Sequence, residues 1–187
     1  MKTTIERSTF KNRATVMALC FVTGFSIFSA SAFAATPANG AITKPASEGE
    51  IKGRNQFYAA RYQAACDVHL ESVQVAGSLA DAPQLEAIFT DTLGYQFTLN
   101  ANGEAYLQLA IKEWNEKMLL MTNRNVTIAM DGADITGTKV TNLQCPDLNG
   151  DIYHINTHEW GSYVLRVTGQ PNQPVAVRIV KEAVKAE

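Results

Sequence analysis

The three histidines are the residues best placed to do chemistry, because imidazole can both bind metal ions and carry protons. His154 and His158 are four residues apart, Glu159 follows directly, and His69 lies far upstream. On a strand, residues four apart lie about 13 Å from each other, so these two imidazoles could share an ion only if the chain turned between them. Metal-binding imidazoles also need supporting partners, and the sequence identifies none. We therefore predict no metal site, and keep a metal-dependent enzyme that uses His69, His154 and His158 as an alternative.

Oxygen-bearing side chains alternate at Asp147, Asn149 and Asp151, a pattern that also occurs in calcium-binding loops. In the helix–loop–helix calcium motif the glycine is the sixth residue from the first aspartate, whereas Gly150 is only the fourth. The flanking residues moreover have the pattern of strands. The sequence therefore predicts an ordinary turn here rather than a calcium site.

The chain lacks the motifs of nucleophilic enzymes and of nucleotide-binding proteins. No serine lies in a Gly-x-Ser-x-Gly turn, and the scattered glycines form no phosphate-binding loop followed by lysine. We therefore expect no cofactor and favour a protein that is not an enzyme.

The segment from His158 to Tyr163 has the composition of a binding surface. It brings an indole, Trp160, and a phenol, Tyr163, together with polar groups near one predicted loop. Such side chains are suited to contacts with sugars or with proteins. We predict His158, Trp160 and Tyr163 as binding residues, with the alternative that Trp160 only covers the core.

The first 34 residues have the pattern of an export signal. A basic start is followed by an uncharged apolar run from Ala14 to Phe28, and small residues lead to Ala32-Phe33-Ala34. The apolar run of about 15 residues is short for a bilayer core, which needs about 20. We therefore expect a signal peptide at 1–34, a periplasmic or secreted product, and no stable membrane insertion after cleavage.

The charge and the cysteines of the remaining chain narrow its partners and its compartment. Removing the four basic residues and one acidic residue of the leader from the totals of 16 and 18 leaves 12 against 17, a net charge of −5. This charge argues against nucleic acid as a partner.

Two cysteines remain, Cys66 and Cys145. In an exported protein we expect them to form a disulfide that joins the first core strand to a late one.

Periodicity predicts one α+β domain at 51–187 after a flexible tether at 35–50 that is rich in proline and glycine. Residues 55–65 have the spacing of a short helix, and 81–89 that of one or two helical turns. Alternating apolar residues predict strands at 67–76, 95–99, 126–130, 137–145, 152–155, 163–167 and 175–180.

One long amphipathic helix is expected from Glu104 to Thr122. Its apolar residues recur at spacings of four, three, four and three, at Leu107, Ile111, Trp114, Met118 and Met121. The fold class expected from these elements is α+β, with a mainly antiparallel sheet or a partly open barrel, this helix packed across it, and one disulfide.

The order of the elements from Cys66 to Cys145 resembles that of the small barrel-like receptor-binding subunits of secreted bacterial toxins. Here a strand and a turn precede a mid-chain helix, Glu104–Met121, which is followed by a strand at Val126–Met130 and a strand that ends at Cys145. In that family a helix lies between the third and fourth strands of a five-stranded barrel with one disulfide. The resemblance implies glycan binding and a ring-shaped oligomer. It rests on the order of the elements, so no binding residue is carried over from that family.

These observations favour a non-enzymatic exported binding or accessory protein that recognises a macromolecular partner, either a protein or a glycan, through loops on a rigid sheet. A glycan-binding subunit of the toxin type and the metal-dependent enzyme are the alternatives.

Overall fold

In the computed structural model of this chain, the structure describes residues 46–91, 93–138, 140–145 and 147–182. These residues all belong to the unit Thr36–Glu187. The expected signal peptide at 1–34 lies outside the described residues, as does most of the expected tether at 35–50. The predicted domain boundaries therefore stay a prediction.

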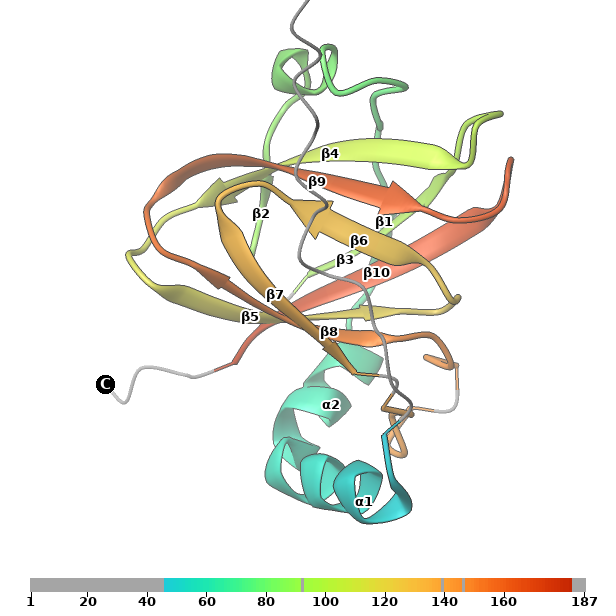
Figure 1. Cartoon of the computed structure of the whole chain (residues 1–187), viewed down its shortest axis with the longest axis vertical. Coiled ribbons are helices and arrows are strands. Elements are labelled where there is room, and N and C mark those ends of the chain that lie inside the picture. The colour runs from blue at the N-terminus through green and yellow to red at the C-terminus, as the bar shows by residue number, and fades with distance from the viewer. Residues whose placement is uncertain (1–45, 92, 139, 146, 183–187) are drawn as a thin grey trace, which may run out of the picture. The chain divides into compact units, whose positions relative to one another are not determined.

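Within the described residues the chain is mainly β and forms two mixed sheets, which do not close into a barrel (Figure 1). The six-stranded sheet has the order β1-β3-β10-β5-β8-β7, and the four-stranded sheet the order β2-β4-β9-β6. The strands are β1 Leu70–Ser72, β2 Ile88–Phe89, β3 Leu93–Thr98, β4 Glu104–Ile111, β5 Glu116–Thr122, β6 Thr127–Met130, β7 Ala133–Thr138, β8 Ile152–Thr157, β9 Gly161–Thr168 and β10 Pro174–Lys181. Only two of the described ladders are parallel, β1 with β3 and β2 with β4.

The main core lies between the two sheets, because alternate residues of each strand point to the same side. In β4, for example, Ala105, Leu107, Leu109 and Ile111 all belong to this core. Residues of β3, β5, β8 and β10 supply the facing layer from the other sheet. The described fold is therefore a β-sandwich.

Two helices, α1 (Glu48–Phe57) and α2 (Ala59–Cys66), cover part of the outer face of the six-stranded sheet (Figure 1). The Oγ of Ser47 caps α1 by accepting from the N–H of Glu50. Tyr62 and Ala65 of α2 are fully buried in a second apolar cluster, which includes Leu119 of β5. α1 begins at Glu48, within the last residues of the expected tether at 35–50.

The disulfide between Cys66 and Cys145 is confirmed, with the two Cα atoms 5.5 Å apart. Its position differs from the expectation. Cys66 is the last residue of α2, and Cys145 lies in the segment after β7. The bond therefore joins a helix to a loop on the outer face of the sheet, and not two core strands.

The predicted helix at Glu104–Thr122 was wrong, because this segment forms β4, a turn and β5. β4 is paired with β9 along its whole length, and β5 lies between β10 and β8. β5 is buried on both faces, so Met118–Met121 is a continuous apolar run, as in any central strand covered on both sides. Because apolar residues occupy both faces of β5, some of them also have the spacing of an amphipathic helix. The element order that suggested the toxin resemblance differs from the observed one at this point.

Other predicted elements are present with different bounds. The strand predicted at 67–76 is reduced to β1, although Val73 and Val75 beyond it still pack against the main core. The helical turns predicted at 81–89 are limited to a 3-10 helix at Ala82–Gln84. The strand predicted at 137–145 shares only its first two residues with the observed strand β7, Ala133–Thr138. The strands predicted at 95–99, 126–130, 152–155, 163–167 and 175–180 are confirmed as β3, β6, β8, β9 and β10.

Candidate functional site

A cleft of about 510 Å³ opens where the helices leave the outer face of the six-stranded sheet uncovered. Under α2 this face is apolar, with Leu119, Met121 and Ile152 in the second cluster. Further along the same strands it becomes polar. Asn156 of β8 lies directly between Lys117 of β5 and Asp134 of β7 in the strand register. The cleft is thus built from one polar cross-strand row and the side of α1.

The side chains around the cleft come from the six-stranded sheet and from the helical segment that packs on it. The sheet contributes Lys117, Asp134, Thr136, His154, Ile155 and Asn156, the residue after β10 contributes Glu182, and α1 and its end contribute Gly53, Arg54, Phe57 and Tyr58. Phe57 is 81% exposed at the rim. A cavity of this size with convergent polar groups is typical of a small-molecule site.

His154 is held between α1 and the end of the sheet. Its Nε2 lies 3.1 Å from Nη1 of Arg54, and its Nδ1 lies 3.7 Å from the carboxylate of Glu182. A guanidinium can only donate, so Nε2 must be the acceptor and the ring proton belongs on Nδ1. Burial lowers the pKa of His154, and the nearby Glu182 opposes that shift. The imidazole is therefore neutral and has both nitrogens occupied by neighbours.

Tyr58 connects α1 to the end of β10. Its hydroxyl donates to Glu182 over 2.8 Å, and its ring lies 5.1 Å from the His154 ring and 5.8 Å from the Tyr62 ring, between centroids. Burial, followed by the hydrogen bond to Glu182, raises the pKa of Tyr58 to about 12. Tyr58 therefore stays protonated and fixes one wall of the cleft.

Two polar groups of the cleft remain without partners among the described residues. The Oδ1 atom of Asn156 is buried and accepts no hydrogen bond. The side chain of Lys117, its cross-strand neighbour, is exposed and forms no ion pair within the described part of the chain. An unpaired buried acceptor costs free energy unless a ligand or water satisfies it.

The three residues predicted for binding do not share one environment. His158 is exposed and lies 2.8 Å from the carboxylate of Asp134 at the edge of the cleft. Trp160 is 63% exposed on the turn between β8 and β9. Tyr163 instead packs against the main core, and its hydroxyl donates to the backbone oxygen of Glu159. The structure therefore places His158 and Trp160 on one turn and turns Tyr163 inward.

A second exposed tryptophan lies on the turn that neighbours the turn of Trp160. Trp114, also 63% exposed, is on the turn between β4 and β5, and the N–H of Asn115 faces the backbone oxygen of His158 at 3.4 Å. We call the two turns, residues 112–115 and 158–160, the turn edge. Trp114 was missed as a binding residue because the helix prediction placed it in the core.

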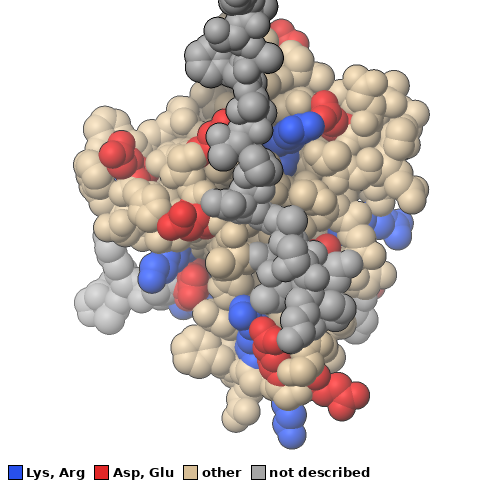
Figure 2. Space-filling model, viewed as in Figure 1, with Lys and Arg blue, Asp and Glu red and all other residues tan. Residues whose placement is uncertain are grey.

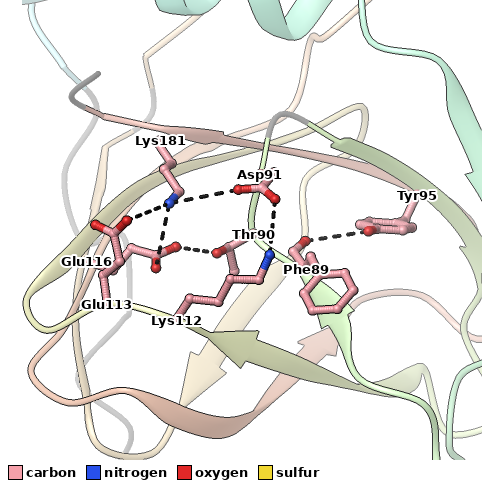
Figure 3. Close-up of polar contacts among 8 residues, drawn as sticks. All are labelled: Phe89, Thr90, Asp91, Tyr95, Lys112, Glu113, Glu116 and Lys181. Carbon is pink, nitrogen blue, oxygen red and sulfur yellow. Dashed lines mark hydrogen bonds and ion pairs between the residues drawn. The ribbon is translucent and has the colours of Figure 1, made fainter. Parts of the chain in front are cut away.

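A charged cluster lies next to the turn edge (Figure 3). The ammonium group of Lys181 is within 4.0 Å of carboxylates of Asp91, Glu113 and Glu116. Glu116 is buried and accepts a hydrogen bond from Thr90. Lys112 pairs with Asp91 at 3.4 Å and lies 4.2 Å from the centre of the Phe89 ring. These charges compensate one another and brace the base of the turn.

The described histidines are not gathered into a metal site. Among the residues that the structure describes, no group of three or more histidine, cysteine, aspartate or glutamate side chains is arranged to hold a metal ion. His154 faces Arg54, His158 faces Asp134, and His69 precedes β1. Nor do the described residues contain a helix with the length and apolar character that a membrane span requires.

Comparison of the chain with protein-family models, with curated proteins and with solved structures gave no match.

Proposed function

We propose that this protein is a non-enzymatic exported binding protein that recognises a glycan through the turn edge. The observation that carries the proposal is the pair of tryptophans, Trp114 and Trp160, each 63% exposed on neighbouring turns. Two large indoles exposed on neighbouring turns place apolar surface in contact with water, which is typical of recognition surfaces.

The surroundings of the tryptophans favour a glycan over a protein partner. Charged side chains lie on and next to the two turns. Lys112 and Glu113 belong to one turn, and Asp134 pairs with His158 of the other. The core of a protein–protein interface is depleted in such charges. A sugar, by contrast, offers an apolar C–H face to an aromatic ring and hydroxyl groups to carboxylates. On the face in Figure 2, basic and acidic residues are interspersed, which gives no support to a nucleic acid partner.

Export and the lack of catalysis are supported by different observations. The leader pattern and the disulfide both fit an oxidising compartment. The best candidate for a general base, His154, has its acceptor nitrogen occupied by Arg54. A base in that state lacks the free lone pair that proton abstraction requires.

The test is a binding screen with the purified protein on printed glycans and on insoluble peptidoglycan, chitin, cellulose and starch. We expect saturable binding to at least one of them, and about tenfold weaker binding after Trp114→Ala or Trp160→Ala, because a buried indole dominates the contact it makes. Leu143→Ala is the matched control, since Leu143 is also an exposed large apolar residue, belongs to neither turn, and has its backbone N–H bonded to Asn55 of α1. Absence of binding to every glycan, or binding that both tryptophan variants retain, would overturn the proposal.

A further inference from the structure

We infer that the cleft between α1 and strands β5, β7 and β8 is a second binding site, which takes a small carboxylate that also carries a hydroxyl group, as in a uronic acid. The cleft does not include Trp114 or Trp160. The inference therefore does not depend on the proposed function of the turn edge.

The basic groups of the cleft account for the carboxylate. Lys117 projects from β5 without an ion pair among the described residues, and Arg54 of α1 lines the same space. Arg54 uses Nε toward Glu50 and Nη1 toward His154, so its second terminal nitrogen has no protein partner among the described residues. The acidic groups of the cleft are already engaged, Glu182 by Tyr58 and Asp134 by His158. Lys117 and Arg54 therefore keep unused donors, and charge-assisted hydrogen bonds from such groups favour a carboxylate.

The unpartnered oxygen of Asn156 accounts for the hydroxyl group. Oδ1 is buried, accepts nothing from the described residues, and belongs to the residue opposite Lys117 in the ladder. An acceptor in this state needs a donor, which a carboxylate alone does not supply. A ligand that reaches both Lys117 and Oδ1 of Asn156 must therefore bear a hydroxyl group a short distance from its carboxylate.

The size and the walls of the cleft suit a sugar acid. A volume of about 510 Å³ lies within the range of small-ligand sites and is larger than a single sugar ring needs. Tyr58 forms one wall, and Phe57 is exposed at the rim, so aromatic surface is available to the ring. The hydroxyl of Thr136, also on the lining, offers a further polar contact.

The experiment is calorimetric titration of the purified protein with D-galacturonate and D-glucuronate, with the uncharged D-galactose and D-glucose as matched controls. We expect saturable binding of a uronate, with a dissociation constant in the millimolar range or below, and at least tenfold weaker binding of its neutral partner. Binding of an oligogalacturonate in place of the monomer would sustain the inference and identify the source as a polysaccharide. No binding of either form, or equal binding of the neutral sugars, would overturn it.

Variants separate the cleft from the rest of the surface. Lys117→Gln should weaken uronate binding about tenfold, whereas Lys52→Gln, on an exposed part of α1 outside the cleft, should leave it unchanged. Asn156→Leu should weaken binding and at the same time raise the melting temperature, because it removes an unsatisfied buried acceptor. Trp160→Ala should not alter uronate binding. Unchanged binding by Lys117→Gln, or loss of binding in Trp160→Ala, would show that no separate site exists in the cleft.

Discussion

The surroundings of His154 fix its protonation state and connect stability to pH. The neutral ring accepts from Arg54, and protonation would replace this hydrogen bond with two facing cations. Burial lowers the pKa of His154 in the folded protein below its ordinary value of 6.5. The unfolded chain therefore binds the proton more readily than the folded one as the pH falls below about 6.5.

We predict that the free energy of unfolding decreases as the pH falls from about 6.5 through the folded pKa of His154, and that His154→Gln makes this decrease smaller. Glutamine cannot take up a proton, so it removes the linkage while it keeps a polar side chain. Urea denaturation at a series of pH values measures the effect. His158→Gln is the control, because His158 is exposed. A pH profile that is the same in the wild type and in His154→Gln would contradict the assignment.

Lys181 compensates a carboxylate that the sandwich buries. The side chain of Glu116 is only 2% exposed, and its second oxygen has no hydrogen bond and faces Lys181 at 4.0 Å. Lys181 is itself 29% exposed, so solvent weakens the interaction.

Removal of Lys181 by Lys181→Met should cost about 1–3 kcal/mol of unfolding free energy, because the buried carboxylate loses its cation. Addition of Glu116→Gln to that variant should restore part of the loss, since the charge is then gone. Chemical denaturation of the two single variants and the double variant completes the cycle. Additive losses would show that the two residues do not interact.

At the scale of elements, the turn between β4 and β5 decides how Trp114 is presented. Asn115 has φ of 50°, in the left-handed region that glycine and asparagine tolerate and β-branched residues avoid. Asn115→Val should therefore destabilise the protein by about 1–2 kcal/mol, while Asn115→Gly should leave its stability nearly unchanged. Thermal or chemical denaturation distinguishes them. Equal stability of the two variants would mean that the turn adopts another backbone conformation.

The same turn shows why the strands at 104–122 could not be predicted from spacing alone. Leu107, Ile111 and Trp114 fit a helical period, yet Ala105, Leu107, Leu109 and Ile111 fit a strand equally well. Whether this segment forms a helix or strands depends on β9 and β10, which pair with it from more than 40 residues further along the chain. Non-local pairing outweighs local periodicity here. In β9, which buries only one face, the alternation of apolar and polar residues was sufficient to predict the strand.

The cleft was accessible to sequence reasoning only in part. His154 drew attention as an imidazole, but as a metal ligand, while its actual neighbour, Arg54, is 100 residues away. Lys117 and Asn156 become neighbours through the register of β5 and β8, which no local pattern specifies. The exposed turn of Trp160, in contrast, was visible as a break between two alternating segments.

At the scale of the whole molecule, the disulfide holds the helical layer to the sheet. Cys66 ends α2, and Cys145 belongs to the cluster that this helix covers. The bond closes a loop of 79 positions that includes most of the sandwich. In the chain-entropy view such a link restricts the unfolded chain and contributes about 4 kcal/mol, with engineered cases often lower.

We predict that Cys66→Ala combined with Cys145→Ala lowers the free energy of unfolding by up to about 4 kcal/mol, and that wild-type protein treated with a reducing agent shows a comparable loss. The variant should also have a larger denaturant m-value, because its unfolded chain exposes more surface. Urea denaturation with and without dithiothreitol measures both quantities. The double variant serves as its own control, since the reducing agent should not change it further. An unfolding midpoint of the wild type that the reducing agent leaves unchanged, together with two titratable thiols in the native protein, would contradict a role for this bond in stability.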